Sequence, residues 1–307
     1  MTMISEKERL VIGVPIRIWR PRLPGSLVAV GPSFAITLLF IYGFIGWTAY
    51  ISFSASKMTP NAKLVGLANY HKLWQFDSWI VSVSNLFIFT ILYVGIAMAV
   101  GLGLAILLDQ RVRAEGFFRT IFLYPAALSL VVTGVVWKWL LNPGTGIEAL
   151  AHDVGLAGFK FDWIINESTV LYAVVIAAVW QVAGFSMAIF LSGLRGVNDE
   201  VIKAARLDGA STLRLYWHVI IPAIRSSFVT VFVLLTAFAL KTFDLVVAMT
   251  AEGPGYASSF PATFMYEMSF ARNQLGVGAA SAMALLVFSL ILVSPYVLMG
   301  GKRDSNA

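Results

Sequence analysis

Six long apolar stretches constrain this chain more than any other feature, because each is long enough to cross a bilayer as a helix, which takes about 20 residues. They cover roughly residues 27–51, 81–108, 120–141, 170–194, 226–250 and 278–299. An α-helix pairs its backbone polar groups within one segment, as a hydrocarbon environment requires. The sequence therefore predicts an all-α membrane protein with six transmembrane helices, whose membrane domain covers residues 27–300.

The composition agrees with a membrane protein and excludes several other classes. Hydrophobic residues make up 59% of the 307 residues and charged residues only 12%, about half the charged share of a soluble domain. The absence of cysteine excludes a disulfide scaffold and a thiol nucleophile. No metal site is expected, because His71, His152 and His218 are far apart in the sequence and form no ligand spacing.

The basic residues predict the orientation of the chain. If both termini are cytoplasmic, the inner segments hold 15 of the 22 Lys and Arg residues and the outer segments hold 5. This bias follows the positive-inside rule, so residues 1–26 and 301–307 are predicted to be cytoplasmic. It also accounts for the net charge of +6 without a nucleic-acid partner. The first apolar run is about twice as long as a signal-peptide core, so we interpret it as an uncleaved span.

The inner loop over residues 195–225 contains a pattern typical of two short helices. Asp199 and Glu200 stand where acidic side chains favour a helix N-terminus, and Gly209 can end that helix in a left-handed conformation. The apolar face of this first helix is expected to consist of Val201, Ala204 and Ala205.

The second half of the loop predicts another amphipathic helix, with Leu213, Tyr216 and Ile220 on its apolar face and Pro222 at its end. Small residues on the face of the first helix permit close approach, which suits docking into a groove of another protein. The alternative is an interfacial segment that lies on the lipid headgroups.

The order of residues in this loop resembles the signature loop of ABC importer permeases. In that family the loop starts Glu-Ala-Ala, has Gly four positions after the second Ala and ends in an apolar-Pro pair. Lys203 stands here where the family usually has Glu. The resemblance implies that the two short helices are coupling helices, which dock on the ATPase subunits. It implies a coupling role for Glu200, Lys203, Ala204, Ala205, Asp208, Gly209, Ala210 and Pro222.

Four further segments resemble the sugar-importing branch of the same permeases, so that the resemblance covers about residues 25–300. They lie around residues 65–85, 123–147, 242–255 and 264–280. The resemblance implies a type I ABC importer permease in the bacterial cytoplasmic (inner) membrane, in contact with membrane lipid. The implied partners are a second permease subunit in a heterodimer, two ATP-binding subunits and an extracytoplasmic sugar-binding protein. The chain has no Gly-rich phosphate loop, so it is expected to bind no cofactor, and a partner ATPase would use the ATP.

Candidate residues for the substrate path lie in the fourth and fifth apolar stretches. Gln181 lies about 16 Å along the fourth span, near the bilayer midplane. Sugars stack on aromatic rings and form hydrogen bonds with amides and charged groups, although aromatic residues in a span also pack helices. In the permease family the two spans beside the coupling loop face the cavity. The candidates are Trp180, Gln181, Phe185, Phe238, Lys241, Thr242 and Asp244.

Three other features have a structural interpretation. Lys241 and Asp244 are three residues apart, so on one helix they would form either an ion pair or a polar wall of the cavity. Tyr93 and the nearby Gly95, Gly101 and Gly103 indicate close helix packing. Lys138, between two tryptophans, is expected to extend toward the membrane surface.

The expected function is transport without chemistry by this chain. We expect a permease subunit for a sugar, with a glucose-like monosaccharide or an α-glucoside favoured. Glycerol phosphate or another polyol is an alternative, less favoured because Lys241 is a single cation that Asp244 would neutralise. The rival from another class is an ion-coupled secondary transporter. A membrane-embedded enzyme is not supported, since the sequence shows no acid–base or metal cluster.

Overall fold

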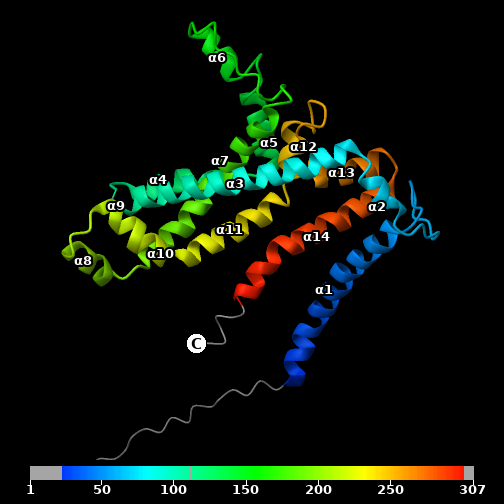
Figure 1. The fold of residues 1–307 in the computed structure, drawn as a ribbon, viewed down its shortest axis with the longest axis horizontal. Helices are drawn as coiled ribbons and strands as arrows, with labels where there is room; N and C mark the ends of the chain where they lie inside the picture. Colours follow the sequence, from blue (N-terminus) through cyan, green and yellow to red (C-terminus); the bar gives the residue numbers. More distant parts are fainter. Residues whose placement is uncertain (1–22, 111, 301–307) are drawn as a thin grey trace, which may run out of the picture. The chain divides into compact units, whose positions relative to one another are not determined.

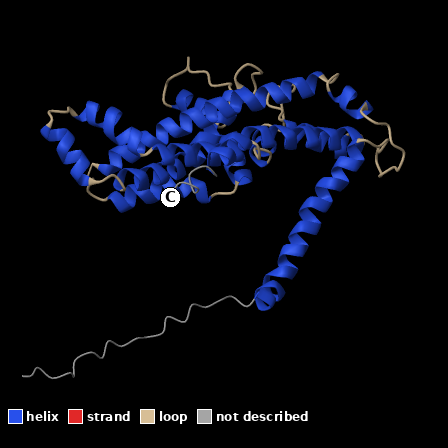
Figure 2. Ribbon diagram, turned by 60° about the horizontal axis from the view of Figure 1, so that its bottom comes forward, coloured by secondary structure: helices blue, strands red, loops and turns tan. Residues whose placement is uncertain are grey.

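A computed structural model of the chain describes residues 23–110 and 112–300. Within these residues the regular structure is helical, and the one β-type pairing is an isolated bridge between Ser54 and Leu64 (Figure 2). The all-α prediction is therefore confirmed for the described part. The two predicted cytoplasmic terminal segments, 1–26 and 301–307, lie outside the described residues except for residues 23–26. The chain divides into two units, one up to Trp47 and one from Thr48 onward.

The first unit contains most of helix α1 (Leu23–Ser52). Large apolar side chains are exposed on every side of this helix from Val30 to Phe44. Only 6% of its most apolar 18-residue window is buried within the chain. A helix that is apolar all round needs an apolar environment, which hydrocarbon or another protein provides.

Four helices are long and apolar enough to cross a membrane without interruption in the described residues. They are Val30–Ser52 within α1, α3 (Asp77–Asp109), α7 (Val170–Arg195), and Leu275–Leu292 within α14 (Leu275–Gly300). These helices occupy the ranges in which the first, second, fourth and sixth spans were predicted. Two bent pairs of helices bring the number of spans to six if each pair is one span: Glu115–Ala127 with Leu130–Leu140, and Thr212–Ala223 with Arg225–Ala239. The first pair overlaps the third predicted range, whereas only the second helix of the other pair lies in the fifth.

The third predicted range does not form the single helix expected over residues 120–141. Instead α4 (Glu115–Leu123) continues into a 3₁₀ turn, η1 (Tyr124–Ala127), and α5 (Leu130–Leu140) leaves at an angle of 100°. Pro125 cannot donate a backbone hydrogen bond, and the two residues after η1 are extended. The expectation of an unbroken helix here is wrong because hydropathy does not register this change in backbone direction.

The fifth predicted range is also interrupted. Helix α11 (Arg225–Ala239) ends fifteen residues after it begins, residues 240–243 form a turn, and α12 (Asp244–Met249) follows. In the turn the Thr242 hydroxyl donates to the Phe238 carbonyl at 3.2 Å. A side-chain donor can thus satisfy that carbonyl in addition to the backbone amides of the helix. An unbroken helix over 226–250 is therefore wrong as well.

The centre of the second unit is the packing of α3 against α7. A Cβ atom on Gly101 of α3 would lie 2.5 Å from the Cβ of Ser186 on α7, so the absence of a side chain permits this approach. The packing prediction is thus confirmed for Gly101. It is wrong for Gly95 and Gly103, where a Cβ would meet nothing within 4 Å, because both face away from the described neighbours.

Most of the short helices of the second unit lie near the two ends of α3 (Figure 1). Near its Asp109 end lie α8 (Asp199–Leu207), α9 (Thr212–Leu215), the π-helical turn η2 (Tyr216–Ile220) and α10 (Ile221–Ala223). Near its Asp77 end lie α2 (Ala68–Leu73), α13 (Pro261–Tyr266) and the π-helical turn η3 (Glu267–Ala271). The remaining short helix is α6 (Ile147–Asp153). The segments predicted to be inner thus share one end of α3.

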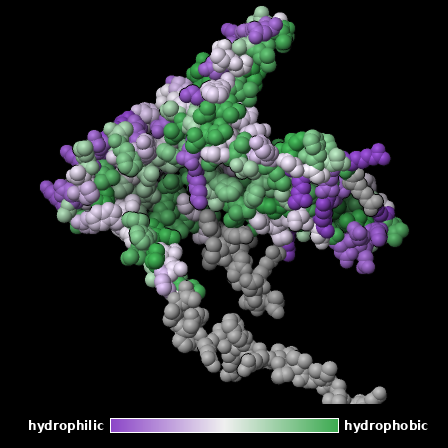
Figure 3. Space-filling model, turned by 180° about the vertical axis from the view of Figure 1, so that it is seen from behind, coloured by the Kyte–Doolittle hydropathy of each residue, from purple (hydrophilic) through white to green (hydrophobic). Residues whose placement is uncertain are grey.

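The surface between these ends is largely apolar. Figure 3 shows hydrophobic side chains over wide areas and hydrophilic residues in separate clusters. Patches of this extent are unusual on soluble monomers and mark contact with lipid or with other proteins. The surface therefore agrees with the predicted membrane protein.

The α3–α7 contact generates a stability prediction. Gly101→Ala should lower the thermal midpoint of the purified protein, because overpacking a tight helix contact costs about 1–3 kcal/mol. Gly103→Ala is the matched control on the same helix, and it should be neutral or slightly stabilising, since Ala favours a helix over Gly. Equal midpoints for the two variants would contradict the close approach at Gly101.

Candidate functional site

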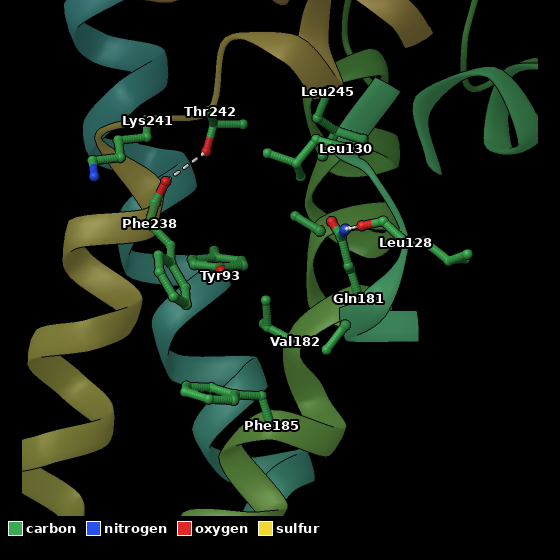
Figure 4. Close-up of a pocket in the computed structure, with 12 residues that line it drawn as sticks. Tyr93, Leu128, Leu130, Gln181, Val182, Phe185, Phe238, Lys241, Thr242 and Leu245 are labelled. Carbon is green, nitrogen blue, oxygen red and sulfur yellow. Dashed lines mark hydrogen bonds between the residues drawn. The ribbon is translucent and has the colours of Figure 1, made fainter. Parts of the chain in front are cut away.

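A cavity of about 390 Å³ lies where the two interrupted spans meet α3 and α7. Figure 4 shows its side chains converging from these elements. The bend after η1 and the turn after α11 both contribute to its wall. Irregular backbone at membrane depth is tolerated where it lines a cavity. The lining residues are Tyr93, Ala126, Leu128, Leu130, Ala178, Gln181, Val182, Phe185, Phe238, Lys241, Thr242 and Leu245.

Gln181 is the central polar residue of this cavity. Its side chain is 5% exposed, and Nε2 donates to the Leu128 carbonyl at 2.9 Å (Figure 4). That carbonyl lies at the bend, where no helical donor reaches it. The other atom of the amide, Oε1, accepts no hydrogen bond from the described residues and lies at the cavity wall. It therefore provides an acceptor for a hydroxyl group.

Aromatic rings form the apolar part of the wall. Phe185 of α7 and Phe238 of α11 have their ring centroids 6.1 Å apart with planes inclined by 50°. Tyr93 of α3 is stacked on Phe89, with ring centroids 5.1 Å apart, and also lines the cavity. The interpretation of Tyr93 as helix packing alone is incomplete. A lone phenol in an otherwise apolar span was the signal that could have identified it.

The structure does not support the expected ion pair between Lys241 and Asp244. The salt bridges of the described residues do not include this pair. The premise of one continuous helix fails, because the turn at 240–243 separates the two residues and removes their shared helical face. Lys241 lines the cavity and Asp244 does not.

Trp180 also lies away from the cavity. It lines a separate apolar groove with Trp137, and the two ring centroids are 5.9 Å apart in an edge-to-face arrangement. Neighbouring residues on a helix point about 100° apart, which explains why Gln181 faces the cavity and Trp180 does not. The structure thus assembles Gln181, Phe185, Phe238, Lys241 and Thr242, and it excludes Trp180 and Asp244 from this group.

The first helix of the 195–225 loop has the predicted ends. The Asn198 side chain accepts a hydrogen bond from the Glu200 amide at 2.8 Å at the N-terminus. At the C-terminus Gly209 has a φ of +80°, and the Ala210 amide donates to the Ala205 carbonyl at 3.1 Å. This is the Schellman arrangement, in which a left-handed residue ends the helix.

The second part of the loop differs from the prediction. Leu215, Ile220 and Ile224 are buried, whereas Leu213 is 70% exposed. The reason is the π-helical turn η2, in which the Ile221 amide donates to the Tyr216 carbonyl. A π-turn places residues five apart on one face. The buried face therefore contains Leu215 and Ile220, rather than residues at the α-helical spacing that was expected.

Helix α8 has no fully buried residue. The predicted apolar face is only partly covered, since Ala205 is half-buried while Val201 and Ala204 are exposed. Leu207 is 89% exposed and Leu213 lies beyond the turn, so both add to this surface. Among the other expected coupling residues, Glu200, Lys203, Asp208, Gly209 and Pro222 are exposed and Ala210 is half-buried. We call the exposed apolar set of Val201, Ala204, Leu207 and Leu213 the loop surface.

A charged anchor that sequence reasoning missed holds the base of this loop. Arg195, the last residue of α7, contacts Glu115 of α4 at 2.8 Å and Asp109 of α3 at 3.9 Å. These residues are 80 or more positions apart in the sequence, so no local pattern indicates their contact. The anchor joins residues 109–119 to the 195–225 loop, and the predicted topology places both on the inner side.

Comparison with known proteins decides the family. Residues 97–299 match the model of the binding-protein-dependent transport system inner membrane component. The chain belongs to this family. The permease is 37% identical over 288 residues to a probable ABC transporter permease of Pyrococcus horikoshii, covering 93% of this chain and 99% of the relative. It is 34% identical to the xylose/arabinose import permease of Haloferax volcanii, covering 89% and 87%.

Further comparisons agree with this assignment. The permease is 29% identical to the sn-glycerol-3-phosphate transport system permease of Agrobacterium fabrum, covering 89% of this chain and 92% of the relative. Its fold matches a chain of a bacterial ABC transporter involved in alginate import, with a TM-score of 0.77, 17% identity and coverage of 92% and 99%. The predicted family and type I permease fold are therefore confirmed. Members of the family are transport subunits and not enzymes.

A polar cluster near the Asp77 end of α3 contains a perturbed carboxyl group. Burial, and then the nearby Glu267 carboxylate, raise the pKa of Glu252 above its ordinary value, although Ser259, Thr263 and Arg272 partly offset this. Glu267 itself is paired with Arg272 at 2.7 Å. Because the folded protein binds the Glu252 proton more tightly than the unfolded chain does, stability should fall as pH rises above about 4.5.

This cluster gives a pH-dependent prediction. Glu252→Gln should raise the thermal midpoint at pH 7 by about 2 °C, and the gain should disappear as the pH falls below the ordinary glutamate value of about 4.5, since the side chain is then protonated in both the folded and the unfolded chain. Glu267→Gln is the contrasting variant, and it should lower the thermal midpoint, since Arg272 loses the carboxylate of its salt bridge. If both variants shift the midpoint in the same direction at pH 7, the effect is one of net charge and the assigned cause is wrong.

Proposed function

We propose that this chain is the permease subunit of an ATP-driven importer for a neutral sugar. The observation that supports it is the cavity wall, which combines aromatic rings with the free acceptor of Gln181 and the amine of Lys241. Such a wall suits a polyhydroxylated molecule, because rings pack on the apolar face of a sugar and polar groups bind its hydroxyls. The sugar-import and alginate-import names of similar proteins favour the same class.

The proposed substrate is a glucose-like monosaccharide or an α-glucoside. Glycerol phosphate is the second candidate, and a specific observation favours it: Lys241 is not neutralised by Asp244 and lines the cavity. Against it, this chain contributes a single cation to a wall that is otherwise mostly apolar. A phosphate dianion would need further cations from a partner subunit.

The proposed assembly contains a second permease subunit, two ATP-binding subunits and an extracytoplasmic binding protein, in the cytoplasmic membrane. The loop surface is the proposed contact with an ATP-binding subunit, since it is apolar, exposed and held by the Arg195 anchor. Hydrolysis in the partner would then move the spans that flank the loop. An importer of this kind requires no ion gradient, which distinguishes it from a secondary transporter.

The cavity generates the first functional prediction. Gln181→Ala should lower sugar transport about tenfold, because the substrate loses an acceptor and the Leu128 carbonyl loses its donor. Trp180→Leu is the matched control, since the neighbouring residue lines the separate groove. Transport by the reconstituted complex and its assembly are measured together. Normal transport by Gln181→Ala would place the sugar elsewhere.

Lys241 separates the two substrate classes. For a neutral sugar, Lys241→Gln should change transport less than about threefold, because glutamine retains hydrogen-bonding groups. For glycerol phosphate the same variant should abolish transport, since a dianion would lose its cation from this chain. The measurement is uptake of both compounds by the same variant complex. Selective loss of glycerol phosphate uptake would overturn the neutral-sugar proposal.

The loop surface generates the last functional prediction. Leu207→Glu should reduce sugar-stimulated ATP hydrolysis about tenfold, as expected when about 1.4 kcal/mol is lost at a contact. Arg206→Ala on the same helix is the control, because it leaves the apolar residues of the loop surface intact. Membrane insertion should be normal in both. Wild-type hydrolysis by Leu207→Glu would show that this surface does not bind the ATPase.

A further inference from the structure

Residues 250–260, which we call the outer segment, connect α12 to α13. Leu245 of α12 lines the cavity, so the outer segment adjoins an element of the cavity wall. Its second and third residues, Ala251 and Glu252, have φ angles of +48° and +70°. Left-handed backbone is disfavoured for residues that carry a Cβ atom, so contacts with the rest of the chain hold this conformation. The outer segment is thus strained and depends on its attachments.

One set of attachments is neutral and binds the second half of the outer segment to α3. The Asn85 side chain donates to the carbonyls of Ala257 and Ser259, both at 3.0 Å. The hydroxyls of Ser82 and Ser259 are 2.8 Å apart, and both residues are buried. Amide and hydroxyl groups do not titrate near neutral pH. These bonds therefore hold the second half on α3 whether the solution is mildly acidic or neutral.

The other attachment is charged. The half-buried carboxyl group of Glu252 accepts a hydrogen bond from the Ser259 hydroxyl at 3.4 Å, and the Glu267 carboxylate of η3 lies near enough to repel it. Arg272 contacts Oε1 of Glu267 through Nε at 2.9 Å and through Nη2 at 2.7 Å. Oε2 of Glu267 is buried and has no hydrogen-bond partner among the described residues. One guanidinium thus serves two neighbouring carboxyl groups, and the charged pair keeps an excess negative charge.

The other titratable groups beside this attachment do not remove that charge. The Tyr256 hydroxyl accepts from Arg272 Nη2 at 2.7 Å, which helps to hold the guanidinium at Glu267. Glu167, from the segment before α7, adds another carboxylate, since a Cβ atom on Gly255 would lie 3.1 Å from its Oε1. A proton on Glu252 removes the excess charge without any further group. Burial and repulsion by Glu267 both favour that proton and raise the pKa of Glu252.

We propose that Glu252 and Glu267 form a proton-operated latch on the outer segment. Neutral Glu252 stays beside Glu267 and holds the first half of the segment in its left-handed conformation. When Glu252 loses its proton, charge repulsion and backbone strain release this half, whereas Asn85 keeps the second half on α3. Because α12 directly precedes the released half, the Leu245 side of the cavity wall gains freedom to move.

The latch is a regulatory device and does not depend on which substrate the permease carries. The predicted topology places residues 251–277 on the outer side of the membrane, so the latch responds to external pH. It is closed in acid and open at higher pH, because the folded segment binds the Glu252 proton more tightly than the released one.

Hydrogen exchange of the assembled complex tests the latch. The Ala251 amide donates to the Val246 carbonyl at 3.2 Å and the Gly253 amide to the Thr250 carbonyl at 3.1 Å, so their exchange reports release of the segment. Their protection, relative to the intrinsic rate at each pH, should fall about tenfold between pH 5 and pH 8. Glu252→Gln imitates the protonated carboxyl group, so its protection should stay high across this range.

Two further variants separate the pair from general charge effects. Glu167→Gln is the matched control, because it removes a neighbouring carboxylate outside the pair and should keep the native pH dependence. Glu267→Gln should lose that dependence, since charged Glu252 then faces Arg272 without a competing carboxylate. The amides of α7 are the internal reference, and their protection should not change with pH.

Uptake measured at a fixed internal pH tests the connection to the cavity wall. Native uptake should be about threefold faster at external pH 8 than at pH 5, and Glu252→Gln should show no such difference. Native protection that is independent of pH, or an equal fall in Glu252→Gln, Glu267→Gln or α7, would overturn the latch. Equal native uptake at both pH values would overturn its connection to the cavity wall. Since exchange is measured without substrate, these results are distinct from a failure of sugar transport.

Discussion

The hydrogen bond from Gln181 to the Leu128 carbonyl is the interaction on which the architecture of the cavity depends. A chain that bends by 100° inside an apolar layer leaves backbone carbonyls without helical donors, and each costs free energy if left unpaired. Gln181 supplies the missing donor from a neighbouring helix. The bend can then persist, and it opens the space that the aromatic rings line. The residue that satisfies the backbone also presents its second amide atom to the cavity, so structure and recognition share one side chain.

The close approach of other elements follows from the same bend. Gly184 lets the end of α4 cross α7, because any side chain there would collide with the Phe122 carbonyl. Gly134 of α5 does the same for α12, with Ala248 only 2.7 Å from the position that a Cβ would take. The two interrupted spans therefore support each other: the bend of the third brings α5 onto α12, and the turn of the fifth directs α12 toward α5.

Hydropathy predicted the uninterrupted helices well and the interrupted ones poorly. Helix α7 begins at the predicted residue and ends one residue later, since nothing interrupts its apolar run. The break near Leu128 was missed because the residues there are as apolar as a continuous helix requires. The break near Lys241 was missed because hydropathy averages over a long window, in which the apolar neighbours outweigh Lys241 and Asp244. The same error produced the expected Lys241–Asp244 pair. In the loop, the start and end of α8 were predictable from local chemistry, whereas the π-turn at 216–220 shifted the buried face in a way that no periodicity indicates.

Helix α7 explains how events at the loop can reach the cavity. Gln181 and Arg195 are fourteen residues apart on one continuous helix, a distance of about 21 Å. A helix of this length, buried over 67% of its most apolar window, cannot bend freely, so displacement of its end moves its middle. The Arg195 contacts with Glu115 and Asp109 connect that end to α4 and α3. Since α4 continues into the bend that holds Leu128, both partners of the central hydrogen bond are connected to the loop. In the proposed mechanism, a push on the loop surface would reach the cavity through α7 and α4 together, and the Gln181–Leu128 contact lies where these two routes meet.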